Sequence, residues 1–238
     1  MATVLIVVAH PDDAEIAMGM RIAEHVRSGD RVRVHCLTTG RPGDTVRQDE
    51  CLRAGAVLGV EYSFSTIPDT RFTDHRGAIN AALFTLFAEV RPDLVYTHYP
   101  DDQHLDHQIT GSETTAVALR ESQDLTYICS PYSQRFEPNL VFMGSSELLN
   151  AKMNALSCFR SQSQIDMDLY RQLAMIMHRR HVHHRVVERF PDATGAAELF
   201  VVARRIEFAA NRIGQNRRAS GSKAWPPVGT TIEAHHLS

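Results

Sequence analysis

The sequence comprises 238 residues with a formal net charge of −3 at pH 7, and 43% of the residues are hydrophobic. A chain of this length can bury a full-sized hydrophobic core within one domain. Its slight acidity excludes the broad basic surface that nucleic-acid-binding proteins carry, so we expect no nucleic acid partner.

Cysteine usage and hydropathy favour a cytoplasmic protein. The four cysteines are widely separated and form no Cys-x-x-Cys pair, so the sequence predicts neither a disulfide framework nor a cysteine zinc site. The first residues lack the basic segment and apolar run of an export signal, and no segment approaches about 18 continuous apolar residues. We therefore expect a cytoplasmic location and no membrane span.

The amino-terminal half alternates between strand-like and helix-like patterns. Residues 4–8 form an apolar run typical of a buried strand, and the segment after it repeats apolar residues at helical spacing until Gly29. Asp44 is suited to cap a later helix and Gly59 to end it. We expect strands at residues 4–8, 31–37, 60–67 and 94–97, and helices at residues 12–28, 44–58 and 79–90.

Strands that alternate with helices predict a parallel sheet with right-handed crossovers. We expect a single α/β domain over residues 1–208, with a Rossmann-like, doubly wound, mostly parallel sheet flanked by helices. Residues 209–238 are polar, and we expect them to form a tail with little core of its own. In such sheets, functional residues gather beyond the carboxyl ends of the strands.

Two clusters of titratable residues follow expected strands. His10, Asp12 and Asp13 come directly after the first strand, and residues 98–107 contain three histidines and three acids. Carboxylates gathered in one crevice repel each other and are costly to bury unless a cation lies between them. We infer a divalent metal, and nitrogen and carboxylate ligands without thiolate suit zinc. His10 and Asp13 can face one ion, His107 is the best third ligand, and a fourth position stays open for water.

These residues resemble the PIG-L or LmbE-like family of zinc-dependent N-deacetylases, which act on N-acetylglucosamine conjugates. The resemblance is carried by His10-Pro11-Asp12-Asp13 followed by Glu15, and by His104-x-Asp106-His107, two motifs in the family's order. It covers roughly residues 1–205, on the scale of one domain. Further positions similar to the family pattern are Arg47, Glu50, Leu58, Gly59, Lys152, Ala155, Leu156, Ser161, Gln162, Glu198 and Phe200.

The resemblance implies a metal site and a general base. Its ligands would be His10, Asp13 and His107, holding one Zn²⁺ per chain, with Fe²⁺ or Co²⁺ as other candidate metals. Asp12 would be the general base, taking a proton from a water molecule whose pKa the zinc lowers to about 7.

The resemblance also implies roles for residues around the metal. His104 would stabilise the tetrahedral intermediate or protonate the leaving amine, and Asp106 would orient it. Asp44 and Arg47 match family positions that bind sugar hydroxyls or the group attached to the sugar, although an arginine on an exposed helix face is also commonplace. One departure is Asp102, which stands where mycothiol-type members carry a tyrosine, so a tyrosine-assisted oxyanion is not implied.

We therefore expect zinc-dependent hydrolysis of the acetamide of an N-acetylated, GlcNAc-type amino sugar conjugate, in secondary-metabolite, antibiotic or low-molecular-weight thiol biosynthesis. We expect a small-molecule substrate as the binding partner. The sequence leaves open whether the chain forms a homo-oligomer.

Two other functions stay open: an amidase of a thiol S-conjugate using the same metal site, and a non-catalytic Rossmann-type binding module. Against the second, residues 8–12 replace the glycine-rich turn of dinucleotide-binding folds. Residues 178–185 are rich in histidine and arginine, and we favour a solvated helix end there over a second metal or phosphate site.

Overall fold

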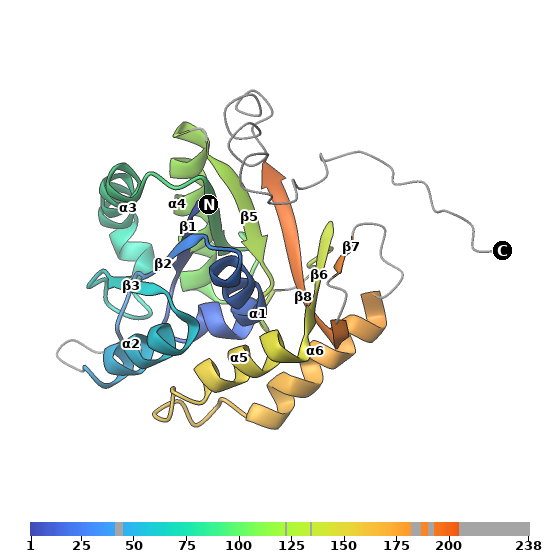
Figure 1. The fold of residues 1–238 in the computed structure, drawn as a ribbon. Helices are drawn as coiled ribbons and strands as arrows, with labels where there is room; N and C mark the ends of the chain where they lie inside the picture. Colours follow the sequence, from blue (N-terminus) through green and yellow to red (C-terminus); the bar gives the residue numbers. More distant parts are fainter. Residues whose placement is uncertain (41–44, 122, 134, 182–186, 190–192, 205–238) are drawn as a thin grey trace.

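The computed structural model describes residues 1–40, 45–121, 123–133, 135–181, 187–189 and 193–204 (Figure 1). The predicted helix cap and substrate-binding residue Asp44 lies outside the described residues, as does the predicted tail at residues 209–238. The same holds for part of the histidine- and arginine-rich segment.

One eight-stranded sheet forms the centre of the described chain. Its strands are β1 (Thr3–Val8), β2 (Arg31–Cys36), β3 (Glu61–Phe64), β4 (Leu94–His98), β5 (Asp124–Ile128), β6 (Leu140–Ser145), β7 (Val187–Arg189) and β8 (Ala193–Arg204). They lie in the order β3-β2-β1-β4-β5-β8-β6-β7, and every pairing is parallel except the two that β8 makes with β5 and β6. The predicted doubly wound, mostly parallel sheet is confirmed, with the third strand shorter than predicted.

Strand β1 shows why the sheet lies between two layers of helices. Val4, Ile6 and Val8 pack into the core on one face, whereas Leu5 and Val7 pack into the core on the other. This division follows because successive side chains of a strand point to opposite faces. All five side chains are fully buried, as expected for a central strand of a parallel sheet covered on both sides.

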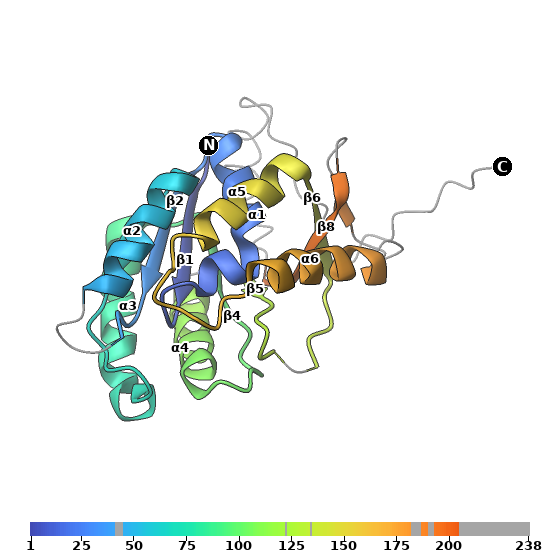
Figure 2. The same ribbon diagram turned by 90° about the horizontal axis from the view of Figure 1, so that it is seen from below.

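Six α-helices of the described chain cover the two faces of the sheet: α1 (Asp13–Arg27), α2 (Val46–Leu58), α3 (Arg76–Val90), α4 (Leu105–Arg120), α5 (Ser146–Leu156) and α6 (Met167–His181). Helices α1, α2, α5 and α6 pack on one face, and α3 and α4 pack on the other (Figures 1 and 2). Gly59 ends α2 in the left-handed conformation with φ of 77°, as the sequence predicted. No helix among the described residues is long and apolar enough to cross a membrane.

Helix α1 is interrupted at Met18, where φ is −146° and ψ is 26°. A buried ion pair lies against this break, formed by Lys152 of α5 and Glu198 of β8 with 2.8 Å between Nζ and Oε1. Lys152 Nζ donates a hydrogen bond of 2.8 Å to the carbonyl of Ile16, and Glu198 accepts bonds of 3.0 and 2.9 Å from two backbone N–H groups after the break. The pair thus satisfies backbone groups that an intact helix would satisfy itself.

Candidate metal centre

The two predicted clusters meet at the carboxyl ends of β1 and β4. The chain continues from these neighbouring strands toward opposite edges of the sheet, which opens the crevice where α/β sheets place their sites. His10, Asp12 and Asp13 come from the turn between β1 and α1, and His104 and His107 come from the start of α4. The first three and His107 are buried, and His104 is partly buried.

The three predicted metal ligands form a triangle of two imidazole nitrogens and the Asp13 carboxylate, whose two oxygens each face one histidine. His10 Nδ1 lies 3.3 Å from His107 Nε2 and 3.3 Å from Asp13 Oδ2, and His107 Nε2 lies 3.3 Å from Asp13 Oδ1. In a tetrahedron with metal–ligand bonds of about 2.0 Å, the ligand atoms stand about 3.3 Å apart. The spacing therefore fits one zinc ion, with a fourth corner left for water or substrate.

The outer nitrogens of both histidines face carboxylates. His10 Nε2 lies 3.3 Å from Asp69 Oδ1 and 3.4 Å from Asp106 Oδ2, and His107 Nδ1 lies 3.4 Å from Asp102 Oδ2. A carboxylate beside the outer nitrogen holds the imidazole proton there and leaves the lone pair of the other nitrogen free. Two such lone pairs facing each other at 3.3 Å are the arrangement that a cation would stabilise, so these residues fit a metal.

The electrostatics of the triangle also favour positive charge. Burial disfavours the imidazolium of His107, but Asp13 and Asp102 outweigh burial and raise the pKa of His107 to about 9. Burial is likewise outweighed at His10, whose pKa the neighbouring carboxylates raise well above its ordinary value. Burial opposes ionisation of Asp13, yet His107 and His98 lower the pKa of this carboxyl well below its usual range. The donor atoms therefore lie in a field that attracts a cation.

Asp12 combines backbone strain with an unsatisfied carboxylate oxygen. Its φ of 90° lies in a region that residues other than glycine rarely adopt, and such strain often accompanies active sites. Asp12 Oδ2 is buried and has no hydrogen-bond partner among the described residues. Burial and the neighbouring charge of Asp13 raise the pKa of Asp12 well above its ordinary value. A carboxylate in this environment is suited to take up a proton.

Arg47 of α2, one of the predicted substrate-binding residues, lies beside Asp12. It donates a 3.1 Å hydrogen bond to the carbonyl of Pro11, and its Nη2 lies 3.6 Å from Asp12 Oδ2. Its Nη1 lies 3.9 Å from Asp69 Oδ2. The guanidinium therefore lines the β3 side of the centre.

His104 also lies at the centre, but Asp106 does not orient it. The His104 ring is stacked on His107 with centroids 4.6 Å apart and meets the edge of His10 at 4.8 Å. Burial and the charges of both histidines lower the pKa of His104. Asp106 accepts a 2.8 Å hydrogen bond from Thr70 N and faces His10 instead. The expected pairing was wrong because residues two apart at a helix start point in different directions.

Three residues of the centre were not predicted as site residues. His98, at the end of β4, is fully buried, places Nε2 3.2 Å from Asp13 Oδ2 and stacks on His107 at 3.9 Å. Burial and His107 lower the pKa of His98 to about 4, so it is neutral. Asp102 accepts hydrogen bonds from Ser130 Oγ and Ser133 Oγ of the β5–β6 connection.

A sequence signal was present for two of them. His98 and Asp102 stand in the second titratable cluster, and a strand-end position could have marked His98. Asp69 stands alone in the loop after β3, and only the fold brings it to His10.

Comparison with models of known protein families shows that residues 5–118 match the family PIG-L, described as GlcNAc-PI de-N-acetylase. A curated relative from Mycobacterium sp. (strain KMS), 1D-myo-inositol 2-acetamido-2-deoxy-alpha-D-glucopyranoside deacetylase, is 31% identical over 153 residues, which cover 49% of this chain and 50% of the relative. The chain thus spans about half the length of this relative.

Solved structures share the fold over most of the chain. GalB, the 4-carboxy-2-hydroxymuconate hydratase from Pseudomonas putida KT2440, aligns with a TM-score of 0.71 and 18% identity, covering 87% of this chain and 98% of its own. N,N'-diacetylchitobiose deacetylase from Pyrococcus horikoshii aligns with a TM-score of 0.65 and 20% identity, covering 84% and 83%. At these identities the likeness concerns the fold alone, which hosts more than one chemistry. Both motifs of the centre lie within the segment that matches the PIG-L family model.

Proposed function

We propose that this chain hydrolyses the acetamide of an N-acetylated, GlcNAc-type amino sugar conjugate, releasing acetate and a free amine. The observation that carries the proposal is the triangle of His10, Asp13 and His107, whose close spacing and neighbouring carboxylates fit one zinc ion. We place the reaction in the cytoplasm, within secondary-metabolite, antibiotic or low-molecular-weight thiol biosynthesis.

The names of similar proteins support this substrate class. The Mycobacterium relative is named for a 2-acetamido-2-deoxy-glucopyranoside of inositol, and the Pyrococcus neighbour for N,N'-diacetylchitobiose. Both compounds carry an acetamide on an amino sugar. The hydratase neighbour is named for a substrate without an amide, so an amide test separates the two chemistries.

The residues of the centre can perform amide hydrolysis between them. A zinc ion held by His10, Asp13 and His107 would supply a Lewis acid that acidifies water and polarises a carbonyl. Asp12 accepts the proton of the water that attacks the amide carbon. His104 delivers a proton to the nitrogen as the carbon–nitrogen bond breaks, because an amine leaves far more readily than an amide anion. The products are acetate and the free amine.

Arg47 and Asp69 are placed to bind the sugar. A guanidinium and a carboxylate on the β3 side of the centre present hydrogen-bond donors and acceptors that match sugar hydroxyls. The neutral His98 beneath Asp13 packs against His107 and fixes the position of that ring.

The proposal is tested by acetate release from a panel of substrates. The zinc-loaded protein is incubated with N-acetylglucosamine that is free, inositol-linked or nucleotide-linked, and with an acetylated thiol conjugate. We expect acetate from at least one acetylated amino sugar, loss of turnover on chelation, and recovery on adding zinc. If purified protein binds no metal and a chelator changes nothing, the proposal is wrong. Hydrolysis of the thiol conjugate alone would instead favour the amidase.

A further inference from the structure

We infer that a cavity beside the metal centre receives the acyl group of the amide, so that the chain hydrolyses not only N-acetyl amino sugars but also, and faster, N-acyl amino sugars whose acyl group is longer than acetyl. This inference rests on the proposed function and specifies its substrate class. An acetyl group ends in a single methyl, which would leave most of this cavity unused.

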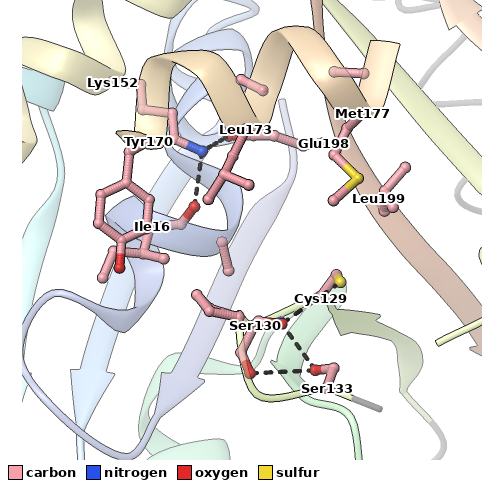
Figure 3. A pocket seen from close by; sticks show the side chains of 14 residues that line it. Ile16, Cys129, Ser130, Ser133, Lys152, Tyr170, Leu173, Met177, Glu198 and Leu199 are labelled. Carbon is pink, nitrogen blue, oxygen red and sulfur yellow. Dashed lines mark hydrogen bonds and ion pairs between the residues drawn. The ribbon is translucent and has the colours of Figure 1, made fainter. Parts of the chain in front are cut away.

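The cavity has a volume of about 310 Å³ and lies between α1, α6, β8 and the β5–β6 connection. Ile16 and Ala17 of α1, Leu173 and Met177 of α6 and Leu199 of β8 give it a mainly apolar lining. Figure 3 shows Leu173 and Met177 on α6, across the cavity from Ser130 and Ser133. A volume of roughly 300–1,000 Å³ with mainly apolar walls and few polar groups is typical of small-molecule sites.

Part of the cavity wall contacts the residues that surround the metal centre. Ser130 and Ser133 line the cavity and donate hydrogen bonds of 2.5 and 3.0 Å to Asp102, the carboxylate beside His107. Ile16 lies within one helical turn of Asp13 on α1. The cavity and the metal centre are therefore neighbours that share Ser130 and Ser133 as a common wall.

Tyr170 of α6 also lines the cavity. Figure 3 shows its hydroxyl pointing away from α6.

The two sides of the metal centre differ in chemistry, and this difference selects the acyl group. Arg47 and Asp69 lie toward the β3 edge of the sheet, whereas the cavity lies toward β5 and β8. An amide of an amino sugar has a polar part on nitrogen and an acyl part on carbon. With the sugar on the polar side of the metal, the acyl part extends into the apolar side.

The ion pair at the cavity wall excludes an anionic occupant. Lys152 is bound to Glu198 at 2.8 Å and to the carbonyl of Ile16 at 2.8 Å, and Glu198 accepts two further backbone hydrogen bonds. Both charges are therefore neutralised within the protein and do not favour a charged ligand, so the cavity suits an uncharged hydrocarbon chain.

The test is a homologous series of N-acyl glucosamines with acetyl, butanoyl, hexanoyl and octanoyl groups, with release of glucosamine measured for the zinc-loaded protein. We expect kcat/KM to rise about three- to fourfold for each added methylene until the cavity is full. Ala174→Leu and, as a second filling variant, Leu173→Trp should reduce the octanoyl-to-acetyl ratio of kcat/KM at least tenfold. Leu169→Phe, at an exposed position of the same helix, should leave that ratio unchanged.

Three outcomes would overturn the inference: acetyl is hydrolysed but longer acyl groups are not favoured, the filling variants leave the ratio unchanged, or only alkyl groups on the sugar's anomeric oxygen increase kcat/KM. If no N-acyl sugar is hydrolysed, the proposed function fails separately. The inference can then still be tested by calorimetric titration of the metal-free protein. It requires N-octanoylglucosamine to bind at least tenfold more tightly than N-acetylglucosamine, and it requires Ala174→Leu to remove this difference.

Discussion

The molecule buries charged side chains at two places along α1, and the two differ in how their partners are arranged. After the break at Met18, Lys152 and Glu198 pair with each other and with backbone groups of α1. At the amino end of α1, the imidazoles and carboxylates face inward at nearly equal distances, and Asp12 Oδ2 has no hydrogen-bond partner among the described residues. The first cluster is complete without a ligand, whereas the second has the geometry of a cation site. Completeness of partners, more than burial or charge, therefore distinguishes the buried ion pair from the candidate metal centre.

The largest effects are expected at the metal centre, where loss of the proposed base and loss of a proposed ligand should have different consequences. Asp12→Asn should lower kcat roughly 10²- to 10⁴-fold because it removes the proton acceptor, while zinc content stays at the wild-type value. His10→Ala should instead lose bound zinc, since it removes a ligand. Metal analysis and acetate release on the same samples check both variants. Undiminished hydrolysis by zinc-loaded Asp12→Asn would show that Asp12 is not the base.

The second largest effect is expected when the buried ion pair of Lys152 and Glu198 is broken. Lys152→Met should lower the free energy of unfolding by about 3–5 kcal/mol because Glu198 is left buried without its cation. The control is Arg31→Met, which removes an exposed ion pair with Glu61 and should cost less than about 1 kcal/mol. Urea denaturation measures both. Equal effects would mean that the buried pair contributes no more than a surface pair.

The third prediction concerns the pH dependence of stability and a buried histidine whose neutral ring has hydrogen-bond partners on both nitrogens. His35 on β2 lies 2.9 Å from Ser63 Oγ and 3.0 Å from Ser65 Oγ, and burial followed by the charge of Arg33 lowers its pKa to about 4. The unfolded chain therefore takes up the proton first, and the free energy of unfolding should fall by up to about 3 kcal/mol as the pH drops from 6.5 to 4.

His35→Gln should flatten this part of the stability–pH curve, measured by denaturant titration at each pH. His75→Gln, in the 3₁₀ turn before α3, is the matched histidine replacement and should keep the wild-type slope. A wild-type slope in His35→Gln would assign the pH dependence to other groups.

The smallest expected effect concerns zinc affinity and the carboxylate that lies beside His107. Asp102→Asn should weaken zinc binding about 10- to 100-fold, because the carboxylate beside His107 Nδ1 no longer holds that ring's proton. Competition with a chromogenic chelator measures the affinity. Asp101→Asn changes the exposed neighbouring acid and should leave zinc binding intact. If both variants bind zinc as the wild type does, the contact of Asp102 with His107 has no role in metal affinity.

Local patterns were sufficient to predict much of the first half of the fold. The apolar run at residues 4–8 is β1, Gly59 ends α2, and both titratable clusters lie at strand ends. These features depend on side-chain periodicity and on the backbone freedom of glycine, which a single sequence displays directly.

Long-range pairing explains what the sequence analysis missed. The antiparallel insertion of β8 between β5 and β6 depends on contacts across many residues, and a strand pattern does not name its partner. Asp69 reaches His10 through the loop after β3, and Ser130 reaches Asp102 through the β5–β6 connection. The direction of Asp106 was predicted wrongly because spacing along a chain does not determine which neighbour a side chain faces at a helix start.

The break in α1 means that the first turns of this helix are held by parts of the chain far beyond it. Lys152 comes from α5 and Glu198 from β8, and both follow residues 5–118, the segment that matches the PIG-L family model. A fragment that ended at residue 118 would contain every proposed ligand but would lack the clamp that shapes the helix carrying Asp13. The carboxyl-terminal half of this molecule therefore helps to shape the helix that carries one of the proposed metal ligands.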